Sequence, residues 1–237
     1  MDLGLAGKVV LVVGGSGLIG RATARALIEE GASVVLASRG GARLTTAAEE
    51  LGIESVAFDA RDADSVAAGV AEAVALHGRL DAAVITAAPS ASTLDTARDR
   101  DPAQILEALD GKALGFLRVA EAVAPHLHAG GAGRIVGVSG QNARLTASVT
   151  GAVRNQVLIT IAKILADAHA GTGTTVNVVN PGPVREDAAH GRPGTAEPGD
   201  SSPEEVAAAI VFLLSRQAGA ISGEQIALGH RLRGVQG

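Results

Sequence analysis

The stretch Val9-Val10-Leu11-Val12-Val13-Gly14-Gly15-Ser16-Gly17-Leu18-Ile19-Gly20 joins five aliphatic residues to a run of closely spaced glycines. The aliphatic run has the length of a buried strand. Gly14 permits a tight turn, Gly17 lets a pyrophosphate approach the backbone, and Gly20 allows close packing of the following helix. We therefore predict a strand, turn and helix that bind a dinucleotide, although a plain strand-to-helix turn has the same pattern.

Short Val/Ile-rich runs alternate with longer Ala-rich segments along the rest of the chain, which is typical of parallel strands joined by crossover helices. Strands are expected near 8–13, 33–37, 53–58, 81–86, 133–138, 174–179 and 225–228. Helices are expected near 18–30, 41–51, 63–77, 102–128, 150–169 and 203–215, the last beginning after Ser202. We predict the α/β class: a Rossmann-like, doubly wound, seven-stranded parallel sheet with helices on both faces.

Composition limits the organisation and the partners. The chain has 237 residues, 47% of them hydrophobic, which suits one domain over 1–237 and is too few for two. A net charge of −5 without a basic stripe argues against nucleic acid and anionic lipid. With no cysteine, no leader and no long apolar span, we expect a cytoplasmic protein without disulfides. No His and carboxylate cluster has ligand spacing, so no metal is expected.

Later segments carry a family resemblance. Asn177-Val178-Val179-Asn180-Pro181-Gly182-Pro183-Val184 follows the sixth expected strand, and Gly133-Arg134-Ile135-Val136-Gly137-Val138-Ser139-Gly140-Gln141-Asn142 spans the fifth. With the glycine turn and the segments 202–207 and 221–226, they resemble the short-chain dehydrogenase/reductase family over essentially the whole chain. The resemblance implies a nicotinamide cofactor, a small-molecule substrate and a homo-oligomer, a dimer or a tetramer.

The glycine turn departs from the family pattern. Short members resemble T-G-x-x-x-G-x-G, whereas this chain has Val13 in place of the threonine and Leu18 in place of the middle glycine. Thr86-Ala87-Ala88-Pro89 replaces the usual Asn-Asn-Ala-Gly turn, so bonds that stabilise the central sheet must come from Thr86 or elsewhere. The spacing is similar to that of atypical members.

The end of the second expected strand bears on the cofactor. Ser38 and Arg39 stand where a carboxylate would hold the ribose of NAD, and both can donate to a 2′-phosphate, so NADP(H) is favoured over NAD(H). Alternatively, Arg39 and Arg43 are solvated residues at a helix start. Asp59 resembles the family's adenine-contacting aspartate, or it caps the next helix. The resemblance assigns cofactor contacts to Gly14, Ser16, Gly17, Leu18, Ile19, Ser38, Arg39, Asp59, Ala60, Ala87, Ala88, Asn155, Pro181, Gly182 and Val184.

The chain contains no tyrosine, and tyrosine is the family's usual proton donor. The family register places its Asn-Ser-Tyr-Lys set on Lys112, Gly140, Gly151 and Asn155, so all four residues are replaced. Gly151 and Asn155 are one helical turn apart and share a face. Asn155 keeps the ability to bond a ribose but carries no charge.

Two function classes remain. In the first, the protein is an atypical NADP(H)-dependent reductase of an activated carbonyl or enone, in which a water, the substrate or one of a few side chains replaces the tyrosine. These catalytic candidates are Ser139, Gln141, Asn142, Lys112 and Asn155. In the second, the fold serves a lyase, isomerase or cyclase, a cofactor sensor, or an inactive partner subunit. Lys112 has a plainer interpretation as a solvated cation on a helix.

A Gly/Pro-rich stretch follows the sixth expected strand. We expect a substrate-covering loop at 183–201, and a rigid surface loop is an equally simple interpretation. His190 lies in this loop and is the only histidine placed to reach a substrate, though a lone loop histidine is usually solvated.

Overall fold

The computed structural model describes residues 2–89, 93–128, 131–144, 148–186 and 200–229. Seven strands form one sheet in the order β3-β2-β1-β4-β5-β6-β7, and every neighbouring pair is parallel. The strands are β1 (Val9–Val13), β2 (Ser33–Ser38), β3 (Glu54–Ala57), β4 (Ala82–Ile85), β5 (Arg134–Val138), β6 (Thr175–Pro181) and β7 (Gln225–Leu228). The predicted fold class is confirmed.

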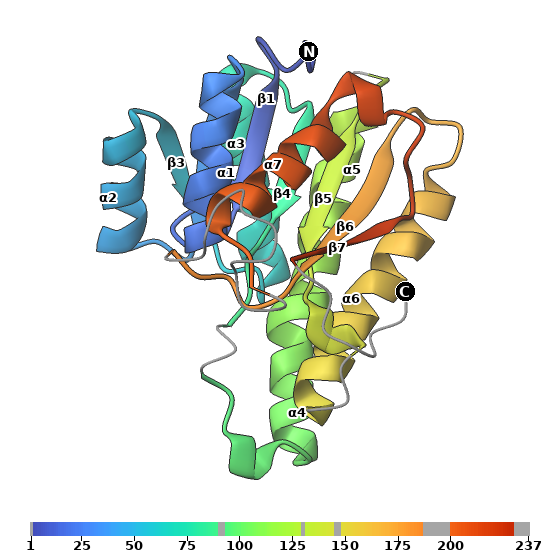
Figure 1. Ribbon diagram of the computed structural model, residues 1–237. Coiled ribbons are helices and arrows are strands. Elements are labelled where there is room, and N and C mark those ends of the chain that lie inside the picture. The colour runs from blue at the N-terminus through green and yellow to red at the C-terminus, as the bar shows by residue number, and fades with distance from the viewer. Residues whose placement is uncertain (1, 90–92, 129–130, 145–147, 187–199, 230–237) are drawn as a thin grey trace.

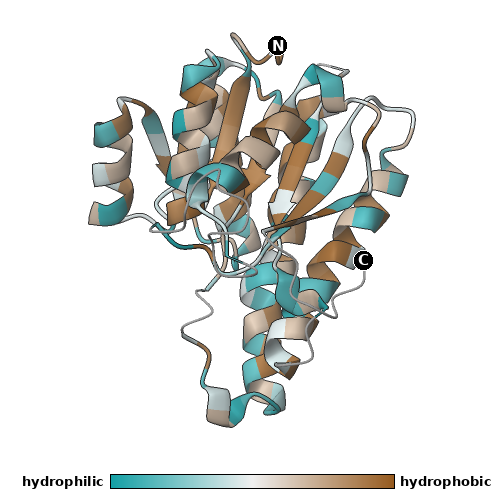
Figure 2. Ribbon diagram, viewed as in Figure 1, coloured by the Kyte–Doolittle hydropathy of each residue, from teal (hydrophilic) through white to brown (hydrophobic). Residues whose placement is uncertain are grey.

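Helices cover both faces of the sheet (Figure 1). Helices α1, α2 and α7 pack on one face, and α3, α5 and α6 pack on the other. Their bounds are α1 (Leu18–Glu29), α2 (Ala42–Leu51), α3 (Ala63–His77), α5 (Gly115–His128), α6 (Val149–Ala168) and α7 (Pro203–Leu214). Hydrophobic residues fill the central strands and hydrophilic ones lie mainly on the helices (Figure 2).

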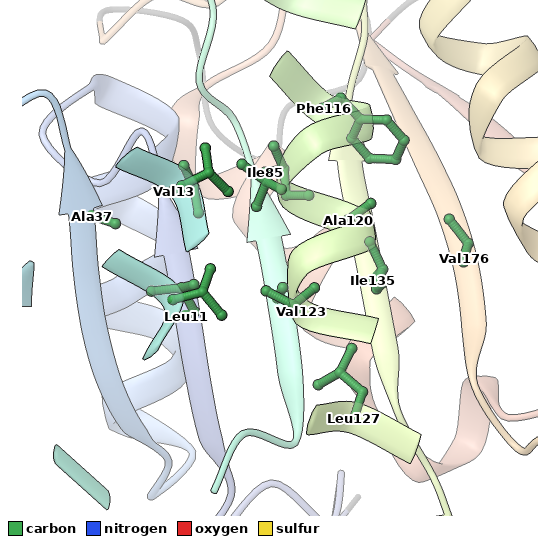
Figure 3. Packing of buried hydrophobic residues seen from close by; sticks show 14 of the residues in the cluster. Leu11, Val13, Ala37, Ile85, Phe116, Ala120, Val123, Leu127, Ile135 and Val176 are labelled. Carbon is green, nitrogen blue, oxygen red and sulfur yellow. The ribbon is translucent and has the colours of Figure 1, made fainter. Parts of the chain in front are cut away.

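The alternation of side chains along β1 builds two separate cores. Leu11 and Val13 belong to the cluster under α3, α5 and α6, whereas Val10 and Val12 belong to the cluster under α1, α2 and α7. Figure 3 shows the cluster under α3, α5 and α6. In it, Phe116, Ala120, Val123 and Leu127 of α5 lie over β4 and β5. Burial on both faces explains why the strands are aliphatic throughout rather than alternating.

The predicted helix at 102–128 is interrupted by a π turn. The chain runs from α4 (Pro102–Leu109) through the π segment η3 (Asp110–Leu114) directly into α5. A π turn widens the helix locally and often occurs at functional sites. Here it buries Gly111, Lys112 and Ala113, and Figure 1 shows α4 beyond the sheet, alongside the first turns of α6.

Most predicted elements agree with the structure to within two residues. Strand β6 is longer than predicted, because Asn180 and Pro181 pair with Ala227 and Leu228 of β7. The predicted start of α7 is confirmed: Ser202 accepts a hydrogen bond from Glu205 N–H, and Pro203 occupies the first turn. Three short 3-10 helices were not predicted: η2 (Thr96–Arg98), η4 (Gln141–Ala143) and η5 (Arg216–Ala218).

Helix α6 is long and apolar enough, by length and composition alone, to cross a membrane. Half of its apolar window is buried inside the fold. Leu158, Ile159 and Leu165 pack in the sheet core, so its apolar character has a structural explanation as a core helix.

Candidate functional site

A cleft of about 730 Å³ lies at the carboxyl ends of β1 to β4. The glycine turn, the loops after β2, β3 and β4, and one end of η3 line it. The strand order reverses between β1 and β4, and ligands of open parallel sheets bind where the order reverses. The cleft is therefore the candidate binding site.

The three glycines of the turn differ in what surrounds them. Gly14 has φ +87°, and a Cβ there would lie 2.3 Å from Thr86 Oγ1. A Cβ on Gly20 would lie 2.4 Å from the Gly14 carbonyl oxygen, so the helix approaches the turn closely. A Cβ on Gly17 would meet only that same oxygen, at 3.3 Å. Gly17 is also the N-cap of α1 and provides no side-chain cap, so the first turn presents its N–H groups beside the cleft, which suits a phosphate.

Cationic side chains line the cleft at the end of β2. Arg39 and Arg43 are exposed, and Ser38 is partly exposed beside them. Neither arginine forms an ion pair with another residue in the described part of the chain. No carboxylate follows β2 directly, so this end of the cleft attracts an anion.

Asp59 does not cap α3, and the capping interpretation is wrong. The N-cap is Asp62, whose Oδ1 accepts a hydrogen bond from Ser65 N–H at 2.8 Å. Asp59 Oδ1 instead accepts from Arg61 N–H at 3.0 Å and holds the turn after β3, where Asp59 and Ala60 line the cleft.

Thr86 joins the neighbouring strands β1 and β4. Its Oγ1 donates to the Val13 carbonyl oxygen at 3.0 Å, and its backbone N–H donates to the same oxygen at 2.8 Å. The expectation that Thr86 supplies the bonds of the missing asparagines is confirmed, because Val13 ends β1 and Thr86 follows β4.

Most of the predicted cofactor residues lie around this one cleft. Those that line it are Gly14, Ser16, Gly17, Leu18, Ile19, Ser38, Arg39, Asp59, Ala60, Ala87, Ala88 and Val184. Asn155, Pro181 and Gly182 do not line it. Pro181 is buried at the end of β6, and Asn155 lies deeper, beside the loop after β5.

The loop after β5 holds the predicted catalytic candidates by structural bonds. Ser139 Oγ donates to the backbone oxygen of Asn155 at 2.9 Å and so ties the loop to α6. Gln141 Nε2 donates to the Leu228 carbonyl oxygen at 2.6 Å, while its Oε1 is buried without a partner among the described residues. These bonds reduce the freedom of Ser139 and Gln141 to serve a substrate.

The positions that would carry the family's serine, tyrosine and lysine do come together. Gly151 and Asn155 are both buried on one face of α6. A Cβ on Gly140 would lie 3.3 Å from Asn155 Nδ2, and a Cβ on Gly151 would lie 3.2 Å from Asn142 Nδ2 and 3.0 Å from Ser148 Oγ. The space at Gly151 is therefore already bordered by polar side chains and is not an open channel.

Lys112 is buried, and the interpretation as a solvated cation is wrong. Its side chain enters from η3, and Nζ donates to the Ser139 carbonyl oxygen at 2.9 Å. Burial, and then the nearby charge of Arg154, lower the pKa of Lys112 to about 7. An amine with this pKa exchanges its proton near neutral pH, which suits an acid or base catalyst.

Arg154 is the residue that sequence reasoning missed. It is buried on α6, and its Nη1 donates to the Pro89 carbonyl oxygen at 3.2 Å. Its Nε is buried without a partner among the described residues, and burial lowers the pKa of Arg154. A signal was present: Arg154 is three residues after Gly151 on the same helix and so shares its helical face.

The start of α6 is fixed by Asp99. The Asp99 carboxylate accepts from Ser148 Oγ at 2.5 Å, Val149 N–H at 2.7 Å and Thr150 N–H at 3.2 Å, and its backbone oxygen accepts from Thr150 Oγ1. These bonds lower the pKa of Asp99, the one from Ser148 most, so the carboxylate stays charged. Asp99 thereby positions the turn that carries Gly151.

The two ends of the predicted covering loop are joined. Val184 forms a parallel bridge with Ser201, and Arg185 Nε lies 3.3 Å from Asp200 Oδ2. The middle of the loop, with His190, lies outside the described residues.

A second cavity of about 140 Å³ lies at the opposite edge of the sheet. Asp81 lines it and accepts hydrogen bonds from Val9 N–H, Arg79 and Lys8. Burial raises the pKa of Asp81, but these bonds outweigh burial and the pKa is lowered. The polar groups bond one another there, which indicates a structural role. Within the described ranges, no three His, Asp or Glu residues gather as a metal site.

Comparison with known proteins agrees with this architecture. The family model described as enoyl-(acyl carrier protein) reductase matches residues 15–229. The short-chain reductase protein NovJ of Streptomyces niveus is 31% identical, over 92% of this chain and 91% of its own. Cis-4-hydroxycyclohexanecarboxylate dehydrogenase of Sinomonas cyclohexanicum is 30% identical, over 96% and 97% of the two chains. The structure of L-sorbose reductase from Gluconobacter frateurii, complexed with NADPH and L-sorbose, is similar with a TM-score of 0.80 at 25% identity, over 98% and 99% of the two chains.

The chain belongs to the short-chain dehydrogenase/reductase family, which is a family of oxidoreductases that bind nicotinamide cofactors. The residues present suit such a cofactor. The approach to the glycine turn is open at Gly17, cations lie at the end of β2, and the buried Asn155 Oδ1 has no partner among the described residues.

Proposed function

We propose that this protein is an NADP(H)-dependent oxidoreductase that reduces an activated carbonyl or an enone with Lys112 as the proton donor. The observation that carries the proposal is the burial of the Lys112 ammonium against the Ser139 carbonyl oxygen, with a pKa of about 7. The Lys112 ammonium would take the place of the family's tyrosine hydroxyl, because this sequence contains no tyrosine.

The cofactor assignment rests on the cleft. Arg39 and Arg43, with Ser38, would bind a 2′-phosphate, and the N–H groups of the first turn of α1 would bind the pyrophosphate. Asn155 Oδ1 would accept a hydrogen bond from a ribose hydroxyl. Bound at these residues, the reduced nicotinamide supplies a hydride.

The protein's own part in the reaction is a proton transfer. The Lys112 ammonium donates a proton to the carbonyl oxygen as the hydride reaches the carbonyl carbon, so the ketone becomes an alcohol and the cofactor is oxidised. Lys112 is left neutral and regains a proton from solvent. Because the acid must be protonated in the free enzyme, kcat/KM should fall as pH rises through about 7.

The first test is calorimetric titration of the purified chain with NADPH and, separately, with NADH. Tighter binding of NADPH supports the proposal and leads to a screen of enones, quinones and hydroxy-aryl ketones. Absence of binding by either nucleotide would contradict it and favour the non-redox alternative of a lyase, isomerase or cyclase, or an inactive partner subunit; it would also exclude the cofactor sensor.

The second test is Lys112→Met. Loss of general acid help lowers kcat by about 10²–10⁴-fold, while NADPH affinity should stay unchanged. Lys163→Met is the matched control, because Lys163 is exposed on α6 and pairs only with Asp167 among the described residues. An unchanged kcat in the Lys112 variant would remove this residue from the chemistry.

Three further expectations belong to this proposal. The chain forms one domain over 1–237 with a substrate-covering loop at 183–201, it assembles as a homo-oligomer of two or four copies, and it acts in the cytoplasm on a small molecule.

A further inference from the structure

Two buried cations face each other beside the loop after β5. Lys112 comes from η3 and is 6% exposed, and Arg154 comes from α6 and is 4% exposed. Each donates to a backbone carbonyl oxygen, Lys112 to Ser139 and Arg154 to Pro89. The Nε of Arg154 is buried and has no hydrogen-bond partner among the described residues. Two like charges thus lie close enough to act on each other, and Arg154 Nε remains an unused donor among the described residues.

No described carboxylate neutralises this pair. The acidic residue nearest in sequence to Lys112 is Asp110, which forms ion pairs with Arg118 and Arg61. The acidic residue that contacts the start of α6 is Asp99, whose oxygens accept from that helix end. Burying an ammonium and a guanidinium together without an anion is unfavourable. A negatively charged group bound at Lys112 and Arg154 would remove this cost.

We propose that Lys112 and Arg154 together bind a carboxylate carried by the substrate, so that the protein acts on oxo acids or acidic enones. A carboxylate is planar and accepts parallel hydrogen bonds from a guanidinium edge, while a second oxygen lone pair takes the ammonium. That the acid is a substrate of reduction rests on the proposed function; carboxylate binding itself needs no nicotinamide.

The position of the pair suits a substrate. Gly111, the residue before Lys112, and Pro89, the partner of Arg154, both line the cleft. The pair therefore lies next to the cleft wall, at the end toward the loop after β5. A substrate that occupies the cleft therefore lies beside the elements that carry Lys112 and Arg154.

Carboxylate binding changes the protonation of Lys112. An anion near an amine favours the charged form, so the ligand should raise the Lys112 pKa from about 7 and keep the ammonium protonated at neutral pH. The groups shown to act on Lys112 are Arg154 from α6 and the Ser139 carbonyl oxygen from the loop after β5, and only Arg154 carries a charge. The carboxylate should bind with uptake of a proton above pH 7 and more weakly as pH rises.

The chain offers a direct measurement, since it has only three lysines, Lys8, Lys112 and Lys163. The ε-carbon resonances of ¹³C-labelled lysine would be followed from pH 5 to pH 11 in the full chain, with acetate as the probe and acetamide as its uncharged match. We expect acetate to raise the Lys112 pKa by about 1–3 and acetamide to leave it unchanged. Lys8 and Lys163 serve as internal controls.

Arg154→Gln should reduce the acetate affinity about 10–100-fold, since it removes charge-assisted hydrogen bonds. Arg154→Lys should keep part of the acetate affinity that Arg154→Gln loses. This comparison distinguishes loss of the charge from a general disturbance of the fold. No acetate effect on Lys112 in the folded wild-type chain would overturn the proposal, and so would an equal effect in Arg154→Gln. The same measurement with NADPH separates the two proposals: an acetate effect without nucleotide binding keeps the carboxylate site and contradicts the reductase, whereas nucleotide binding without an acetate effect does the reverse.

Discussion

The cations at the carboxyl edge of the sheet differ in burial between its two halves, one around β1 and β2 and the other around β5 and α6. Around β1 and β2 the cations Arg39 and Arg43 are exposed and line an open cleft. Around β5 and α6 the cations Lys112 and Arg154 are buried and bonded to backbone oxygens. An exposed charge keeps its hydration, whereas burial lowers the pKa of Lys112 and of Arg154.

This difference indicates which half changed its chemistry. The first half has a glycine turn and a free helix start, although Val13 and Leu18 depart from the family pattern, and it needs no unusual group to bind phosphates. In the register of the family resemblance, the second half has Gly151 and Asn155 at the tyrosine and lysine positions, and a buried titratable group, Lys112, lies on η3. A proton donor and an anion site are both served by a buried amine, but not by a solvated one.

The largest expected effect comes from Lys112→Met in the buried half. In the folded chain the pKa of Lys112 is about 7, against 10.5 ordinarily, so between these pH values the unfolded chain binds a proton that the folded chain does not. The free energy of unfolding of the wild type should therefore rise with pH across this window relative to the variant. Below pH 7 the wild type should be less stable than the variant by up to about 4–5 kcal/mol.

Urea unfolding at pH 6 and pH 9.5 measures this effect. The control Lys163→Met should show a pH dependence like that of the wild type, because Lys163 is exposed. Parallel stability curves for wild type and Lys112→Met would mean that the ammonium is solvated, and the contrast between the halves would disappear.

The next effect distinguishes two glycines of the open half. Gly20→Ala should lower the free energy of unfolding by about 3 kcal/mol, because its Cβ would lie 2.4 Å from the Gly14 carbonyl oxygen. Gly17→Ala meets only one atom, at 3.3 Å, so it should remain stable yet bind NADPH more weakly. Chemical denaturation and nucleotide titration of both variants make the comparison. Equal stability of the two would show that α1 does not pack tightly on the turn.

Arg39→Asp tests the exposed cations. It should reduce the affinity for NADPH relative to NADH by about 10–100-fold, because a 2′-phosphate loses a charge-assisted bond and meets a carboxylate. Calorimetry with both nucleotides gives the ratio. Arg25→Asp provides a control on α1, away from the lining of the cleft. An unchanged preference between NADPH and NADH in Arg39→Asp would show that Arg39 does not bind the 2′-phosphate.

The smallest effect concerns the hydrogen bond by which Thr86, after β4, holds Val13 of β1. Thr86→Val removes the hydrogen bond to the Val13 carbonyl oxygen and keeps the shape, so the free energy of unfolding should fall by about 1 kcal/mol. Thr86→Ser keeps the hydroxyl and should lose less. Should Thr86→Val match the wild type in urea, the backbone bond from Thr86 N–H would suffice to hold β1 to β4.

The fold was largely predictable because its signals are local. The five aliphatic residues of β1, the glycines after them and the Ser202-Pro203 start of α7 act through neighbours in sequence. The π turn η3 was not predictable, because π and α segments share the same residue types. The extension of β6 through Pro181 likewise depends on its pairing with β7.

The candidate site was predictable in its open half and less so in its buried half. Glycine spacing and the Ser38-Arg39 pair locate the cleft from sequence alone. Lys112 was a candidate with a plausible solvated alternative, since burial of a helical lysine depends on what packs over it. Arg154 was missed for the same reason, although its position on the face of Gly151 was a usable signal.

By itself, the sequence determined that this is one sheet of seven parallel strands and that no tyrosine can donate a proton here, because hydrophobic periodicity and composition do not depend on long-range contacts. Only the tertiary structure decided where the charges stand. Arg39 is exposed, whereas Lys112 and Arg154 are buried together, since burial arises from segments that are distant in sequence and adjacent in space. That placement changes an ordinary lysine into a group that titrates near neutral pH.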